Sequence, residues 1–396
     1  MKRFLLFLIS SVGFFASAQT IARPKLVVGM VVDQMRPDYL YRYYSRFGVG
    51  GFKRLLQQGF VCENTFIPYS PTYTAPGHAC VYTGSVPSLH GIIGNNWYDK
   101  IKKRVVYCTD DDSVHTIGST SIAGHMSPKN LWSNTITDEL RLATNFRNKT
   151  IAIALKDRGS ILPGGHTANA AYWYDIANGA WISSSFYMNS LPAWVQKINE
   201  RKLPDSFLKK NWKTLYNINT YTQSTADDKP YEDRIPHGSH TFLHQTDSIT
   251  TGRYESFEYT PYGNTLTLQM AKEAIKNEGL GKSGFTDFLA VSLSSTDYIG
   301  HMFGPNSIEI EDTYLRLDKD LASFLSYLDA TVGKGQYLFF LTADHGVAHI
   351  AGFEQEEKIP AGAIDDAVMR SALNTAIEKQ YAITGAIASV INYQVY

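Results

Sequence analysis

Five side chains of metal-ligand type follow three apolar segments of this chain. The segments are 25–32 (KLVVGMVV), 286–293 (TDFLAVSL) and 336–342 (QYLFFLT), and the side chains after them are Asp33, Asp297, His301, Asp344 and His345. Ligands of open α/β sheets bind beyond the carboxyl ends of the strands, so we expect these groups to meet at one sheet edge. Aspartate and histidine are ligands that zinc accepts. The pattern predicts a metal-assisted phosphoryl-transfer site, although Asp33 taken alone also suits a helix cap.

A hydroxyl at the start of a predicted helix supplies a candidate nucleophile. Thr74 lies in the segment PTYTAPGH (71–78), where Pro76 suits an early helical position because its missing N–H costs nothing there. A threonine hydroxyl attacks only when a base or a metal lowers its pKa, and a helix N-terminus stabilises the negative oxygen. The alternative interpretation is that Thr74 or Thr72 only caps the helix.

Two cationic side chains and one amide complete the candidate site. Lys156 and Arg158 follow the apolar segment 150–155 (TIAIAL). Alternate residues of an extended stretch point the same way, so we expect these two cations to converge on one ligand. An ammonium and a forked guanidinium suit a phosphoryl dianion. Asn95 is a further candidate contact to the phosphoryl group, or else a turn residue.

The elements that must position these residues alternate between strand and helix patterns. Helices are predicted over 37–59, 75–83, 137–144, 266–275 and 312–328. The alternation predicts an α/β fold with a doubly wound, mostly parallel sheet flanked by helices. Residues 167–262 break this alternation, being rich in aromatic and polar residues with several prolines, and predict an inserted cap region. Residues 385–396 have a strand-like pattern.

The N-terminus and the charge balance limit the location and partners of the protein. Residues 1–18 combine basic residues, a short apolar run and Ala-Ser-Ala, which predicts a secretory signal peptide and a periplasmic or secreted catalytic domain over 19–396. Apart from that run, whose length is short for a membrane span, the sequence offers no stretch suited to stable membrane insertion. Lys plus Arg and Asp plus Glu both number 37, so the charge balance argues against a nucleic-acid partner.

The motifs around these residues make the chain resemble the alkaline phosphatase superfamily, most closely its threonine-nucleophile, PafA-like branch of phosphate monoesterases. From about Arg23 to about Gly352 the resemblance is carried by VVDQMRPDYL, PTYTAPGH, TGSVPSLHGIIGNNWYD, LKDRGSILP, SSTDYIGHMFGPNS and TADHGVAH. It implies an exported, zinc-dependent alkaline phosphatase that hydrolyses small phosphomonoesters through a phosphothreonine intermediate on Thr74.

The resemblance also implies which residues hold two zinc ions and the substrate. Asp33, Asp344 and His345 would bind one zinc together with Thr74. Asp297 and His301 would bind the second. Asn95, Lys156 and Arg158 would contact the phosphoryl group, and the Lys-x-Arg pair distinguishes such monoesterases from the related nucleotide pyrophosphatases and phosphodiesterases.

One departure from the family concerns the second zinc. The family supplies it with another histidine from near the C-terminus, whereas the last histidine here is His349, which matches the ordinary DHGxxH stretch. We therefore expect a C-terminally truncated member with an incomplete second zinc site. The alternatives are a phosphodiesterase of the same superfamily and a truncated chain that binds phosphate or zinc without turnover. A sulfatase is disfavoured, because no modified-cysteine motif surrounds the cysteines and Thr74 stands at the nucleophile position. The spacing of His237, His240 and His244 also resembles that of metal-binding histidines.

Overall fold

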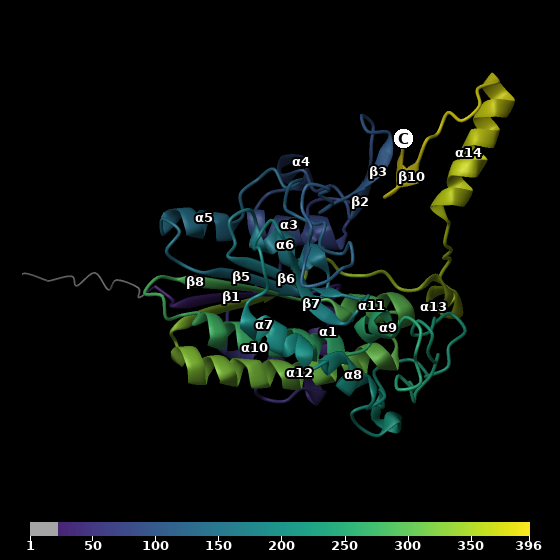
Figure 1. Cartoon of the computed structure of the whole chain (residues 1–396). Helices are drawn as coiled ribbons and strands as arrows, with labels where there is room; N and C mark the ends of the chain where they lie inside the picture. The colour runs from purple at the N-terminus through teal and green to yellow at the C-terminus, as the bar shows by residue number, and fades with distance from the viewer. Residues whose placement is uncertain (1–22) are drawn as a thin grey trace, which may run out of the picture.

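A central sheet with helices on both faces organises the chain (Figure 1). The computed structural model describes residues 23–396, so the predicted signal peptide lies outside the described residues. The strands of this sheet are β1 (Leu26–Val32), β4 (Thr116–Ile117), β5 (Thr150–Ala154), β6 (Ala170–Asp175), β7 (Ala180–Ser184), β8 (Asp287–Leu293) and β9 (Tyr337–Thr342). Over the described range the sheet has seven strands in the order β4-β7-β6-β5-β8-β1-β9.

The strand directions confirm the predicted fold class. The β6-β5-β8-β1-β9 part is parallel throughout, and β7 and β4 add antiparallel strands at one side. A separate antiparallel hairpin is formed by β2 (Asn96–Asp99) and β3 (Arg104–Tyr107). The result is an α/β fold with a doubly wound, mostly parallel sheet.

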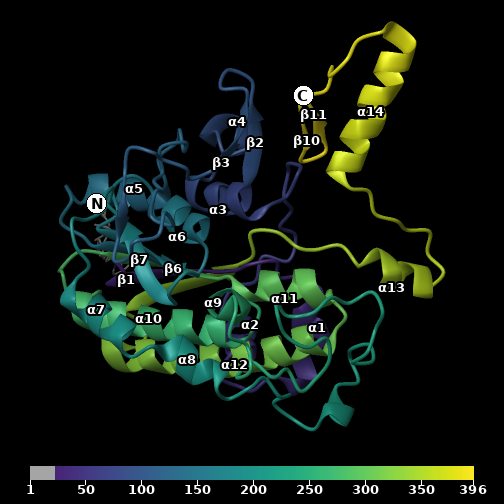
Figure 2. The same ribbon diagram turned by 45° about the vertical axis from the view of Figure 1, so that its right-hand side comes forward.

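Helices cover both faces of the sheet (Figures 1 and 2). On one face lie α3 (Thr74–Thr83), α4 (Pro87–His90), α5 (Ile136–Ala143) and α6 (Asp157–Gly164). On the other lie α1 (Asp38–Arg42), α2 (Phe52–Gln58), α7 (Ala193–Glu200), α8 (Leu203–Leu208), α9 (Arg253–Glu258), α10 (Tyr262–Glu278), α11 (Ser295–Phe303) and α12 (Ile308–Leu328). Two layers of helices explain why β1, β5 and β8 are apolar on both faces.

Strand register aligns the ends of four strands that carry candidate site residues. Val31 of β1 pairs with both Ser292 of β8 and Thr342 of β9, and Ser292 pairs with Ala154 of β5. These four residues therefore form one continuous rung across the sheet. Because each strand ends at or just after this rung, the residues that follow emerge at the same sheet edge.

The predicted helix over 37–59 is wrong, because the chain breaks it into α1, a 3₁₀ turn (Tyr44–Arg46) and α2. The backbone N–H groups of Gly48, in the loop before α2, and of Phe52, the first residue of α2, donate to the Asp318 carboxylate at 2.7 and 2.8 Å. Gly51 lies so close to Asp318 that a Cβ there would meet its Oδ1 at 2.2 Å. A loop bound to a buried carboxylate of α12 thus replaces the helix.

The region 167–262 begins inside the central sheet, because β6 and β7 are two of its strands. The following segment contains α7, α8, a 3₁₀ turn (Ile218–Thr220) and α9, joined by loops. Asp312 of α12 accepts hydrogen bonds from Trp212 Nε1, Leu215 N and Tyr221 OH at 2.8, 2.6 and 2.5 Å. The part of the region outside the sheet is therefore fastened to the helical layer.

The chain after β9 leaves the sheet and forms separate elements. These are α13 (Ala351–Glu356), α14 (Asp366–Tyr381), and a short hairpin of β10 (Val390–Ile391) and β11 (Gln394–Val395). α14 has no buried residue and stands away from the sheet in Figure 2, whereas the hairpin returns to β2 through Asn392 Nδ2 and Asn96 O, 2.6 Å apart. Within residues 23–396, we find no helix that combines the length and apolar character needed to cross a bilayer.

The centre of β1 is packed too tightly to accept a side chain. A Cβ on Gly29 would lie 2.4 Å from Phe340 Cζ and 2.6 Å from Tyr82 OH. We expect Gly29→Ala to lower the free energy of unfolding by about 1–3 kcal/mol, since overpacking forces neighbouring side chains to move. Denaturant unfolding measures this, with Gly362→Ala as control because its Cβ would meet no atom within 4 Å. Equal stability of the two variants would contradict the packing of β1.

Candidate functional site

Three buried side chains meet at the sheet edge just described. Asp33, Asp297 and His345 offer ligand atoms that all lie within 4.8 Å of one another, and all three side chains are buried. Asp33 follows β1 directly, Asp297 lies in the first turn of α11 after β8, and His345 follows β9. Three separate segments of the chain thus deliver one possible metal-binding group, as the strand-end pattern predicts.

Buried carboxylate oxygens indicate that this group fits a cation. Asp33 Oδ1 is buried without a hydrogen-bond partner in residues 23–396, and Asp344 Oδ2 lies 3.1 Å from the His78 imidazole. Such oxygens are costly unless a cation or a proton satisfies them. His345 Nδ1 lies 2.7 Å from the Gly346 carbonyl, so a proton on Nδ1 leaves Nε2 as the free, metal-ligating nitrogen. The donor set of carboxylates and imidazole suits zinc.

Lys156 extends into the same cluster and bridges two of its carboxylates. Its Nζ lies 2.8 Å from Asp33 Oδ2 and 2.5 Å from Asp297 Oδ2, and the side chain is almost fully buried. Burial would raise the pKa of Asp297 and Asp33 adds repulsion, but the Lys156 ammonium and His301 hold that pKa at about 2. Burial would lower the pKa of His345, yet Asp344 and Asp33 raise it to about 10. The carboxylates of the cluster thus strongly stabilise positive charge on the groups beside them.

Thr74 is the first residue of α3 and faces this cluster. Its Oγ1 lies 3.5 Å from both Lys156 Nζ and His345 Nε2. Tyr73 occupies the N-cap position and the helix has no side-chain cap, so the interpretation of Thr74 or Thr72 as a simple cap is wrong. The hydroxyl is buried at a helix N-terminus, where the backbone N–H groups favour negative charge.

Asp297 and His301 lie one turn apart on α11, with His301 Nε2 3.1 Å from Asp297 Oδ1. Their spacing therefore puts both on one side of a helix. The His301 side chain is 65% exposed, whereas that of Asp297 is 6% exposed. A metal bound by Asp297 and His301 would therefore be accessible to water on the His301 side.

The extended stretch expected to carry both Lys156 and Arg158 is absent. Only Lys156 is extended, and α6 begins at Asp157, so the two are not alternate residues of one strand. Lys156 enters the carboxylate cluster, while Arg158 Nη1 donates to Tyr107 OH at 2.9 Å. Asn95 Oδ1 accepts the Ala75 N–H of α3 at 2.9 Å, which fixes its amide beside the start of the helix that carries Thr74.

Sequence reasoning missed Gln34 and considered His78 only as a supporting or surface histidine, yet both connect the site elements. Gln34 Nε2 donates to Asp297 Oδ1 at 2.7 Å, and its backbone N–H donates to Asp344 Oδ1 at 3.1 Å. Its φ of 66° is rare for a non-glycine residue and marks strain at a functional site. His78 lies 2.9 Å from Thr74 O, 2.7 Å from Ser292 Oγ and 3.1 Å from Asp344 Oδ2. A polar residue directly after a strand-end aspartate was the available signal for Gln34.

The other histidines considered from sequence do not join this cluster. His349 Nδ1 contacts Asn306 Nδ2 at 2.8 Å, and its Nε2 contacts Arg36 Nη1 at 3.3 Å. His244 pairs with Glu309, whereas His240 pairs with Asp228, so they face different partners.

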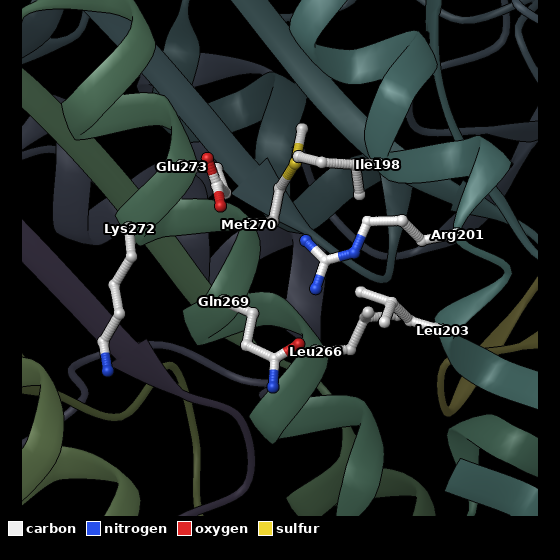
Figure 3. Close-up of a pocket in the computed structure, with 8 residues that line it drawn as sticks. All are labelled: Ile198, Arg201, Leu203, Leu266, Gln269, Met270, Lys272 and Glu273. Carbon is white, nitrogen blue, oxygen red and sulfur yellow. The ribbon is translucent and has the colours of Figure 1, made fainter. Parts of the chain in front are cut away.

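A small cavity of about 120 Å³ lies between α7, α8 and α10, in the helical layer on the face of the sheet away from α3 (Figure 3). Its lining includes Ile198, Leu203, Leu266 and Met270, together with the charged side chains of Arg201, Lys272 and Glu273. None of the candidate site residues lines it. The chemistry therefore belongs to the sheet edge and not to this cavity.

The chain is similar to a described protein family and to several named proteins. A family model described as type I phosphodiesterase / nucleotide pyrophosphatase matches residues 27–386. Alkaline phosphatase PhoV of Synechococcus elongatus is 61% identical over 87% of this chain and 62% of its own length. A Myroides odoratus protein named calcium-transporting ATPase is 53% identical over 96% of this chain and 70% of its own length.

A third relative has a known structure. Alkaline phosphatase PafA of Elizabethkingia meningoseptica is 49% identical over 100% of this chain and 73% of its own length. A crystal structure of PafA matches with a TM-score of 0.91 at 50% identity, over 95% of this chain and 72% of that one. The chain therefore spans about 62–73% of the length of these relatives.

The candidate ligands divide into a set of three and an exposed pair, and this difference leads to a prediction about metal retention. We expect the 396-residue chain to hold one divalent metal tightly at Asp33, Asp344 and His345, and a second weakly at Asp297 and His301, because fewer ligands bind less firmly. Elemental analysis during stepwise chelator dialysis measures the release. His301→Ala should remove only the weak metal, while the matched variant His349→Ala should leave both. Simultaneous loss of two metals would contradict the assignment.

Proposed function

This chain belongs to the type I phosphodiesterase / nucleotide pyrophosphatase family, and on that premise we propose that it is a zinc-dependent alkaline phosphatase acting on small phosphomonoesters. One observation carries the proposal. The buried Thr74 hydroxyl lies at a helix N-terminus within 3.5 Å of both an ammonium and an imidazole nitrogen, beside aspartates that need a cation. A nucleophile, positive charge and ligand set in one place suit phosphoryl transfer.

In the proposed reaction, Thr74 Oγ1 gives up its proton and attacks phosphorus, and the bond from phosphorus to the leaving oxygen breaks. The leaving oxygen takes up a proton and departs as the alcohol. The product is a phosphothreonine, which water then hydrolyses to free phosphate and the original hydroxyl. Asp33, Asp344 and His345 would hold one zinc, and Asp297 and His301 a second. Bound zinc supplies Lewis acidity, favouring both the threonine alkoxide and the departing oxygen. The N-terminus of α3 adds partial positive charge beside Thr74.

The charge of the cationic residues favours a monoester over a diester. A monoester dianion carries one more negative charge at the transferred group than a diester, and Lys156, Arg158 and Asn95 are the groups available to contact it. The names PhoV and PafA describe alkaline phosphatases, which supports this choice. The name calcium-transporting ATPase also implies hydrolysis of a bond to phosphorus, in that relative.

A phosphodiesterase or nucleotide pyrophosphatase is the second candidate, because the matching family carries that description. Both activities would use the same nucleophile and metals, so the relative rates on monoester and diester decide between them. A chain that binds phosphate or zinc without turnover is the third candidate, since the relatives are longer. Export to the periplasm or medium is proposed from residues 1–18 alone.

Replacement of the nucleophile tests the proposed intermediate. We expect Thr74→Ala to abolish phosphoenzyme formation and to reduce hydrolysis by about 10³-fold or more, because the covalent route is lost. Mass spectrometry of acid-quenched enzyme after incubation with p-nitrophenyl phosphate measures the adduct. The exposed Thr72→Ala provides the matched control and should keep it. A phosphate found on Thr72 would overturn the assignment.

Removal of either cation tests the substrate class. We expect Lys156→Ala and Arg158→Ala each to slow monoester hydrolysis by roughly 10- to 150-fold, which corresponds to about 1.5–3 kcal/mol for a charged hydrogen bond. Diester hydrolysis should fall less, because a diester carries less charge at the transferred group. The kcat/KM values on p-nitrophenyl phosphate and bis-p-nitrophenyl phosphate measure both effects. Equal losses on the two substrates would argue against a monoesterase.

A further inference from the structure

We propose that Tyr107 is a positioning residue that holds the Arg158 guanidinium ready for a phosphoryl dianion without neutralising its charge. The inference rests on the proposed function, because it assigns Arg158 to the phosphoryl group. Tyr107 is the last residue of β3, in the β2–β3 hairpin outside the central sheet, and no sequence motif had singled it out.

The geometry is a chain of three hydrogen-bonded side chains. Arg158 Nη1 lies 2.9 Å from Tyr107 OH, which in turn lies 2.7 Å from Asp157 Oδ1. The second oxygen of Asp157 accepts from Thr109 Oγ1 at 2.5 Å. Each oxygen of the carboxylate therefore has its own donor, and the phenol stands between the carboxylate and the guanidinium.

The donor and acceptor capacities fix the direction of this chain. A guanidinium only donates and a carboxylate only accepts, so the single hydroxyl hydrogen of Tyr107 points to Asp157 and its lone pair accepts from Arg158. Tyr107 cannot reverse these roles without losing one bond. The phenol is thus held in one orientation, and it holds one nitrogen of the guanidinium in turn.

The arrangement leaves most of the guanidinium available. Within residues 23–396, Tyr107 is the only side chain that accepts a hydrogen bond from Arg158, and the Arg158 Nε is buried without a partner. A buried, unpartnered donor is unfavourable unless a ligand satisfies it. A direct ion pair with Asp157 would orient Arg158 as well, but it would also cancel the charge that attracts an anion. A neutral phenol avoids that loss.

The hairpin also connects Tyr107 to another proposed substrate contact. Tyr107 pairs with Asn96 in the β2–β3 ladder, and Cys108 N donates to Asn95 O at 2.9 Å. Asn95 and the residue that holds Arg158 are therefore neighbours across one hairpin. Displacement of this hairpin would move two of the three proposed phosphoryl contacts together.

The test is a double-mutant cycle on the metal-loaded, full chain. Tyr107→Phe removes only the hydroxyl, and we expect about a tenfold loss in both monoester kcat/KM and the affinity for inorganic phosphate measured by calorimetry. Diester kcat/KM and metal content should change little. In an Arg158→Ala background the same substitution should have no further effect, because Tyr107 acts through Arg158.

Tyr82→Phe is the matched control, since the Tyr82 side chain is buried and its OH donates to Gly29 O at 3.2 Å without touching Arg158. It should leave phosphate affinity unchanged. If Arg158→Ala weakens phosphate binding but Tyr107→Phe does not, the positioning role alone is overturned. If Tyr107→Phe reduces activity equally with and without Arg158, its role is structural and the inference is wrong. If Arg158→Ala leaves phosphate binding intact, the proposed phosphoryl contact fails and the inference fails with it.

Discussion

Repulsion among Asp33, Asp297 and Asp344 is the constraint on which the rest of the site depends. These carboxylates are buried at one sheet edge, where their charges are poorly screened by water. The Lys156 ammonium bridges two of them, and the raised pKa of His345 supplies a second positive charge. Placement of so many like charges together requires a fold that holds them firmly, and cations that compensate them.

Strand register is what holds them. Val31, Ala154 and Thr342 lie on one rung of the sheet through Ser292, and each is followed two residues later by a charged site residue. These followers are Asp33, Lys156 and Asp344. Parallel strands have no tight turn to set their register, so the burial of both faces of β1, β5 and β8 must do so. The core packing that sets the strand register therefore also sets the geometry of the site.

Much of this arrangement could be predicted from the sequence. The continuous apolar runs identified β1, β5, β8 and β9, and the strand-end rule then indicated which polar residues share an edge. The partner of Arg158 could not be predicted, because α6 begins at Asp157 and the guanidinium contacts Tyr107 of a separate hairpin. That contact joins residues about fifty positions apart, across a hairpin without a recognised motif.

Local pattern also failed where a distant side chain determines the backbone. The break between α1 and α2 depends on Asp318, which lies in a helix far along the chain and binds two backbone N–H groups of the loop. Gln34 adopts its positive φ while its side chain reaches Asp297 and its N–H reaches Asp344. In each case, long-range hydrogen bonds outweigh the conformation that neighbouring residues favour.

The shared rung also separates two kinds of change that the chain can undergo. The long connection from β7 to β8 leaves and rejoins the sheet and carries none of the candidate site residues, so its length can vary while the reacting groups stay in place. A one-residue deletion inside β1 or β8 would instead shift a carboxylate by about 3.3 Å along the strand. New substrate preferences can therefore arise in the connection from β7 to β8 at little risk to the chemistry, whereas the strands tolerate substitutions that keep their volume and almost no change in length.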